Sequence, residues 1–133
     1  MTSYIANDEY GTDVPQGGAP FARKELHARG AVTQITTINT GVTLHKLWGE
    51  ITTVSQTVAG AAEFNIVVTN NMVSRSDVVL VCLRSANGGA GVFMLAVTNV
   101  TDGAFTITGT NVDAAAGNSV LNISFVVIKN PYR

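Results

Sequence analysis

The stretch VFMLAVTNVTDGAFTITGT, residues 92–110, decides the fold class. Two runs rich in valine, threonine and phenylalanine flank the tetrapeptide TDGA at 101–104, and β-branched and aromatic residues are typical of strands. An Asp-Gly pair between two such runs favours a tight hairpin turn, because its central residues must adopt positive φ. The stretch therefore predicts two antiparallel strands, 92–100 and 104–110, joined by this turn.

The same β pattern extends on both sides of this hairpin, from residue 32 to residue 128. Apolar residues recur at every second position between turn signals such as Asn70-Asn71. The predicted strands cover residues 32–38, 42–48, 50–58, 63–69, 77–83, 92–100, 104–110 and 120–128. Eight strands form about two packed sheets. The sequence therefore predicts an all-β fold, an antiparallel two-sheet β-sandwich with either a jelly-roll or an immunoglobulin-like strand order.

The run VVLVCL at 78–83 departs from this alternation, because it is apolar throughout. In a two-sheet sandwich one face of each sheet lies in water, so a strand that is apolar on both sides needs a second cover. The N-terminal segment, a neighbouring copy or both are the candidate covers. Cys82 is the single cysteine and excludes an intrachain disulfide. Inside this run its thiol is expected to behave as a small buried hydrophobe.

Residues 1–30 differ in composition from the rest of the chain. They are rich in glycine, proline and polar residues and carry few bulky apolar side chains, so they cannot bury enough surface to fold alone. Residues 20–29 match a short helix, with proline in its first turn and Gly30 just past its end. The chain therefore divides into an extended N-terminal arm over 1–31 and a β-sandwich domain over 32–133.

Composition excludes several classes of partner. The chain has 133 residues, is 46% hydrophobic, and carries 8 basic against 9 acidic side chains, which gives a net charge of −1. Such a low charge argues against electrostatic binding of nucleic acid or of a membrane surface. No apolar run approaches the ~20 residues of a membrane helix, and no secretory signal pattern is visible. We expect synthesis in a reducing cytoplasm.

Residues that could carry chemistry are few and scattered. His27 and His45 are the only histidines, and neither has a recognisable partner for activating a nucleophile. One cysteine and no closely spaced histidine pair argue against a zinc site. Asp77, Asp102 and Asp113 lie at apparent strand starts or turns, where aspartate commonly binds its own backbone. We therefore expect no catalytic residue, no metal and no cofactor, and a protein that is not an enzyme.

The densest charge cluster lies in the N-terminal arm, where a short helix would present a basic face beside two apolar side chains. Such a face is either solvated or part of a docking arm, and the contrast with the apolar domain favours the docking arm. Trp48 is more typical of a core than of a binding platform, but it can also contribute apolar contact beside the arm. The predicted partner interface comprises Phe21, Arg23, Lys24, Glu25, Leu26, Arg29, Leu44 and Trp48.

The order of segments resembles that of small virion proteins of tailed bacteriophages. The residues that carry this resemblance are AGAAEFNIVVTNNMV at 59–73, SDVVLV at 76–81, NVTDGAFTIT at 99–108 and LNISFVVI at 121–128. Together they extend over roughly residues 51–128. The likeness is one of style and segment order and includes no catalytic signature.

The resemblance implies a capsid decoration (cement) protein, a homotrimer of β-sandwiches on the outer capsid surface. Its partners would be copies of itself and the major capsid protein, whose subunits it would bridge to stabilise the capsid of the virion. An N-terminal arm fits this role, because it can reach a neighbour. The alternative is a fibre-tip or capsid-surface receptor-binding module that recognises host glycans through loops 87–91 and 114–118. Neither loop contains an aromatic residue, although sugar sites usually do.

Overall fold

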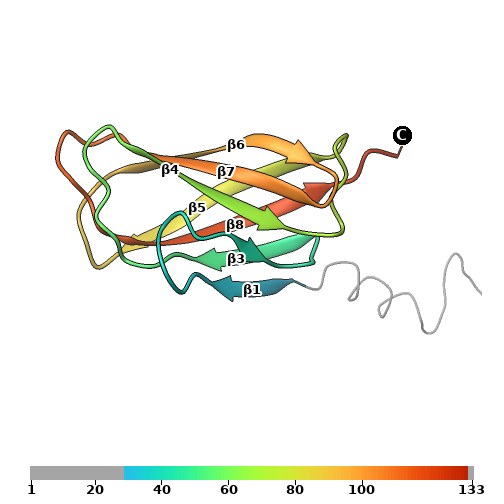
Figure 1. Cartoon of the computed structure of the whole chain (residues 1–133), viewed down its shortest axis with the longest axis horizontal. Helices are drawn as coiled ribbons and strands as arrows, with labels where there is room; N and C mark the ends of the chain where they lie inside the picture. The colour runs from blue at the N-terminus through green and yellow to red at the C-terminus, as the bar shows by residue number, and fades with distance from the viewer. Residues whose placement is uncertain (1–28, 132–133) are drawn as a thin grey trace, which may run out of the picture.

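Two four-stranded β-sheets pack face to face in the computed structural model, which describes residues 29–131 (Figure 1). The strands are β1 (Gly30–Thr33), β2 (Val42–Thr43), β3 (Trp48–Thr52), β4 (Glu63–Thr69), β5 (Val78–Asn87), β6 (Phe93–Thr101), β7 (Ala104–Asn111) and β8 (Val120–Ile128). Sheet I has the order β1-β3-β8-β5, and sheet II has the order β2-β4-β7-β6. The predicted all-β, two-sheet sandwich is confirmed.

Both sheets are mixed, so the expectation of antiparallel sheets is wrong at one edge of each. Strand β1 pairs in parallel with β3, and β2 pairs in parallel with β4. The four other pairs are antiparallel. The chain alternates between the sheets over its first strands, so the segments 34–47 and 44–62 act as crossovers. A crossover of about a dozen residues or more is what parallel pairing requires.

The first three strands are shorter than the alternation predicts. The Gln34 N–H still donates to the Thr52 carbonyl of β3 at 2.9 Å, but beyond Gln34 the backbone is bound by side chains instead of by a neighbouring strand. The Gln34 amide nitrogen donates to the carbonyl oxygens of Ile38 and Thr40 at 3.1 and 2.6 Å, and the Gln56 side-chain oxygen accepts from the Ile38 N–H at 2.6 Å. Such side-chain bonds compete with sheet ladders. The predicted strand 32–38 therefore ends at Thr33.

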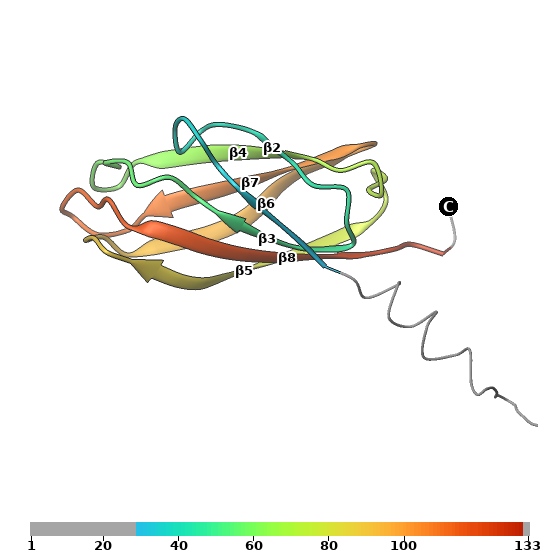
Figure 2. The same ribbon diagram turned by 90° about the horizontal axis from the view of Figure 1, so that it is seen from below.

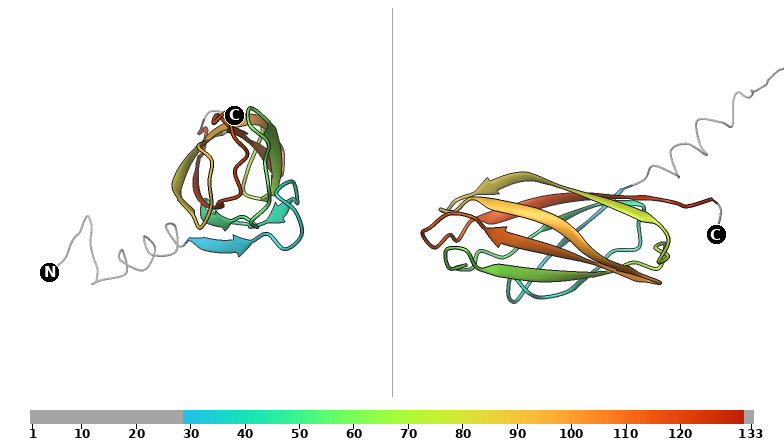
Figure 3. Two further views of the ribbon diagram at one scale, coloured as in Figure 1. Left: turned by 90° about the vertical axis from the view of Figure 1, so that its left-hand side faces the viewer. Right: turned by 90° about the horizontal axis from the view of Figure 1, so that it is seen from above.

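The C-terminal strands agree with the prediction within a few residues, apart from β5, which extends to Asn87. The Asp-Gly turn is confirmed, since Thr101 pairs with Ala104, but of its two central residues only Gly103 has positive φ (88°), so the expectation of positive φ at both central residues is wrong for Asp102. Positive φ costs glycine nothing because it has no Cβ. The views in Figures 2 and 3 show the long strands β5 and β8 side by side and the two sheets enclosing the core.

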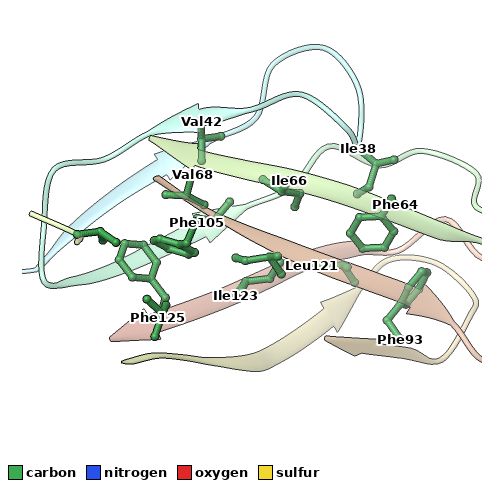
Figure 4. Packing of buried hydrophobic residues seen from close by; sticks show 14 of the residues in the cluster. Ile38, Val42, Phe64, Ile66, Val68, Phe93, Phe105, Leu121, Ile123 and Phe125 are labelled. Carbon is green, nitrogen blue, oxygen red and sulfur yellow. The ribbon is translucent and has the colours of Figure 1, made fainter. Parts of the chain in front are cut away.

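The core between the sheets contains the same cross-strand pairing of glycine with phenylalanine twice. In sheet I, Gly49 of β3 pairs with Phe125 of β8, and in sheet II, Gly109 of β7 pairs with Phe64 of β4. A Cβ at either glycine would overlap the phenylalanine ring opposite it. Phe125 also meets Phe105 edge to face, with ring centroids 5.0 Å apart (Figure 4). Each glycine therefore makes room for a buried aromatic ring of its own sheet.

Candidate functional site

The outer face of sheet I carries a row of large apolar side chains. Trp48 of β3 and Leu80 of β5 both pair with Val126 of β8, which lies between them. Trp48 is 42% exposed and Leu80 is 52% exposed. Val78 and Ile128 pair with each other at one end of the sheet and are also exposed. We call these five residues the apolar face.

A hollow of about 560 Å³ opens beside this row. It forms because Cys82 and Ser124, which pair with each other, place two small side chains next to the large ones. Its lining comprises Trp48, Leu80, Val81, Cys82, Ser124, Phe125 and Val126. Phe125 and Val81 pack with the core, so they contribute the floor. The hollow is thus an apolar depression on the surface of the sheet.

Charged side chains border the apolar face. The Arg29 guanidinium lies over the Trp48 ring, 6.0 Å from its centroid, in a cation–π arrangement. Glu50 and Arg84 form a salt bridge of 2.5 Å that spans the central strand of sheet I. An exposed pair of this kind adds little stability, but it neutralises both charges locally.

The structure describes three residues of the predicted partner interface. It brings Arg29 and Trp48 together, as given above. Leu44 instead packs against the core, where its methyl groups approach Gly30 and Gly49. Most of the predicted helix 20–29 lies outside the described residues. The same holds for Phe21, Arg23, Lys24, Glu25 and Leu26.

Two expectations about burial are wrong on this face. Cys82 is exposed, because it points outward between Val81 and Leu83, which face inward. Trp48 is exposed rather than a core residue. The unbroken apolar run at 78–83 was the available signal for this face, since it predicts a second cover. Within the described residues nothing covers its outer side, so Leu80 stays half exposed.

Asp77 is a buried carboxylate with a structural role. It accepts hydrogen bonds from the Lys129 ammonium at 2.6 Å and from the backbone N–H groups of Ser74 and Asn130 at 2.8 and 3.0 Å. Burial alone would raise the pKa of this carboxyl, but the bonds from Lys129, Asn130 and Ser74 hold the pKa well below its usual range. Asp77 therefore joins the turn before β5 to the chain that follows β8.

The two loops of the alternative glycan hypothesis lie side by side. The Ala90 N–H donates to the Asn118 side-chain oxygen at 3.2 Å, and the Asn118 N–H donates to the Ala90 carbonyl at 3.0 Å. Ser119 donates its hydroxyl to the same carbonyl at 3.1 Å. Loops 87–91 and 114–118 thus form one hydrogen-bonded end of the sandwich.

Residues 29–131 contain no candidate metal site and no candidate membrane-spanning helix. In that range no three His, Cys, Asp or Glu side chains gather as metal ligands would. The same residues contain no helix that is both long enough and apolar enough to cross a membrane. His45 accepts a hydrogen bond from the Asn71 N–H at 2.9 Å, whereas His27 lies outside the described residues.

No protein-family model, curated protein or solved structure matches this chain. Function must therefore be inferred from the residues and their geometry. The apolar face and its hollow lie outside the core, so the packing of the fold does not account for them.

Proposed function

We propose that this protein is a virion structural protein of a tailed bacteriophage, a decoration protein that binds the outer capsid surface. The apolar face carries the proposal. An exposed sheet face is normally polar, and an apolar patch with a charged border marks a contact with another protein. The resemblance of residues 51–128 to small phage virion proteins supports the capsid as the setting.

In this proposal the protein acts by binding alone and performs no reaction. The two-sheet sandwich assembles as a homotrimer. The predicted arm included Gly30 and Ala31, which belong to β1, so the residues that precede β1 serve as the arm that reaches adjacent subunits, including the major capsid protein. Phe21 and Leu26 supply apolar anchors there, and the neighbouring charged residues set the register through ion pairs. The capsid is stabilised because its subunits are bridged.

Binding to capsids that lack the protein tests this proposal. We expect the full chain to sediment with capsids of the phage that encodes it and to raise the temperature at which they disrupt. A Phe21→Ser/Leu26→Ser variant should lose most of this binding, because its anchors are gone. Val67→Ser is the matched control, since Val67 is an exposed apolar residue on the outer face of sheet II. A full chain that binds no capsid contradicts the proposal.

A second candidate function is glycan binding by a receptor-recognition module. The observation that favours it is the hydrogen-bonded contact between loops 87–91 and 114–118, which joins polar groups from both. A glycan array with the isolated protein separates the two functions. Binding that is lost on Asn87→Ala would support this candidate, whereas an empty array together with capsid binding would eliminate it.

A further inference from the structure

The described part of the chain begins at one end of the row on sheet I. Strand β1 is the edge strand beside β3 and begins one residue after Arg29 (Figure 1). The Arg29 guanidinium lies over the exposed Trp48 ring, 6.0 Å from its centroid, so it is on the outer side of the sheet. From Trp48 the row continues across the sheet to Val126 and Leu80. Residues 1–28 are therefore joined to the molecule at the rim of the apolar face.

A segment attached at this rim can cover the face more readily than a separate molecule can. Sheet I is four strands wide, about 14 Å between its outer strands, and its longest strand has ten residues, about 33 Å. That outline is under about 500 Å², whereas a stable two-body interface buries about 800 Å² on each partner. Separate molecules must also offset the translational and rotational freedom that they lose on binding. A segment of the same chain avoids most of that loss, because its attachment gives it a high effective concentration.

The predicted helix over 20–29 would place bulky apolar side chains on the side of Arg29. At 3.6 residues per turn, Leu26 and Phe21, three and eight positions before Arg29, point within about 80° of it. His27 points the opposite way. Because the Arg29 guanidinium lies on the outer side of sheet I, such a helix turns Leu26 and Phe21 toward the apolar face.

The length of this helix matches the width of the face. A helix rises 1.5 Å per residue, so residues 20–28 span about 14 Å, which is also the distance from β1 to β5. Counted from β1, Leu26 reaches about as far as β3, where Trp48 lies. Phe21 reaches about 12 Å, close to Cys82 of β5 and to the hollow of about 560 Å³. The hollow is lined mainly by apolar side chains and therefore suits an aromatic ring.

We infer that residues 20–28 dock on the apolar face of their own chain in the free protein, with Leu26 against Trp48 and Phe21 in the hollow. An uncharged face suits many apolar partners, and attachment at its rim selects this one. The inference adds a regulatory step to the proposed function and in that respect rests on it, because capsid binding would take the same two anchors away from sheet I. Until then the anchors and the apolar face shield each other from water.

Two native reporters test this cover in the full chain, since Trp48 is its only tryptophan and Cys82 its only cysteine. We expect the Phe21→Ser/Leu26→Ser variant to shift Trp48 emission to the red and to raise the rate at which Cys82 reacts with a thiol reagent about tenfold. His27→Ser is the control in the same segment and should leave both signals unchanged. Equal signals in the wild-type chain and in the double variant overturn the inference.

A disulfide tests the contact directly. With oxidised glutathione to accept the two electrons, Phe21→Cys should form a disulfide with Cys82 of the same chain, because such a bond requires Cα atoms within about 7 Å of each other. His27→Cys is the matched control and should form none. Mixing normal chains with isotopically heavy ones shows by mass whether the bond lies within one chain. A bond between two chains would assign the cover to the arm of a second copy, and that result or the lack of any bond overturns the inference.

The outcome is distinguishable from that of the capsid experiment, because emission, thiol reactivity and disulfide formation are measured without capsids. An arm that docks on sheet I in a chain that binds no capsid contradicts the proposed function alone. Capsid binding by a chain whose Trp48 and Cys82 signals ignore the double variant contradicts this inference alone. Signals that change with protein concentration would assign the cover to another copy and would also overturn it.

Discussion

The two sheets are alike on their inner faces and different on their outer faces. Inside, each sheet sets a glycine against a phenylalanine, Gly49 against Phe125 and Gly109 against Phe64. Outside, sheet I carries the apolar face, whereas sheet II carries a chain of hydrogen bonds. There the Thr98 and Thr108 hydroxyls lie 2.8 Å apart, and Thr108 donates to the Asn65 side-chain oxygen at 2.6 Å.

This difference separates the requirements of folding from those of function. The inner faces must fill one core, and both sheets use the same packing to do so. Most side chains on the outer face of sheet II are polar and satisfy each other and water, as expected of a solvated sheet, although Val67 and Met94 are also exposed there. The apolar side chains of the row on sheet I form no such hydrogen bonds with each other or with water. Their exposure therefore favours contact with a partner.

The edge strands β5 and β6 share one irregularity but use it differently. Each contains a register shift, at Arg84 in β5 and at Thr98 in β6. Bulges of this kind twist an edge and discourage strand addition. In β5 the extra residue, Arg84, forms the salt bridge with Glu50. In β6 the hydroxyl of the extra residue, Thr98, lies within hydrogen-bond distance of the Thr108 hydroxyl. Both edges are thus protected, which leaves the open face of sheet I as the distinctive surface.

The largest expected effect tests the likeness of the inner faces. Phe125→Ala and Phe64→Ala should each lower the free energy of unfolding by about 3–5 kcal/mol, because both rings are 1% exposed and face a glycine that cannot fill the cavity. Urea unfolding followed by circular dichroism measures both values. The Phe→Leu variants should cost less. A much smaller loss in one sheet would show that the inner faces are not equivalent.

Local patterns in the sequence were sufficient for the strands that follow a simple rule. Alternation predicts β4 and β8, and the Asp-Gly turn predicts the β6–β7 hairpin. The same alternation fails after Thr33, since Gln34 binds the loop backbone in place of a ladder. The apolar run 78–83 indicated a strand covered on both faces, but in the structure Val78 and Leu80 are exposed. The neighbours of Leu80 in the apolar face come from distant strands, and only the pairing register brings them together.

A medium effect tests how the turn before β5 is held to the chain that follows β8. Asp77→Asn should lower the free energy of unfolding by about 1–3 kcal/mol at neutral pH, because the buried carboxylate loses its charged bond to the partly exposed Lys129. Asp113→Asn in the exposed loop is the control and should change little. An equal loss in both variants contradicts the structural role of Asp77.

The same variant predicts a pH dependence. The folded pKa of Asp77 lies below its unfolded value of 3.8, so the carboxylate stabilises the fold fully above about pH 4, and this contribution is lost as the pH falls through the folded pKa. The wild-type protein should therefore lose stability more steeply in acid than Asp77→Asn does. Urea titrations at neutral and acidic pH measure the difference, which should shrink as the pH falls. A constant difference would exclude this linkage.

The smallest expected effect tests the outer face of sheet II. Thr108→Val keeps the side-chain shape but removes the hydroxyl between Thr98 and Asn65, so we expect a loss of about 0.2–1 kcal/mol in the free energy of unfolding. Thr106→Val, on the same face of β7, is the control for added apolar surface. Neither variant should alter the solution mass, because both change only the outer face of sheet II and leave the apolar face of sheet I intact. A change in mass would mean that sheet II also meets a neighbour, and the contrast between the outer faces would no longer separate a solvated surface from a binding one.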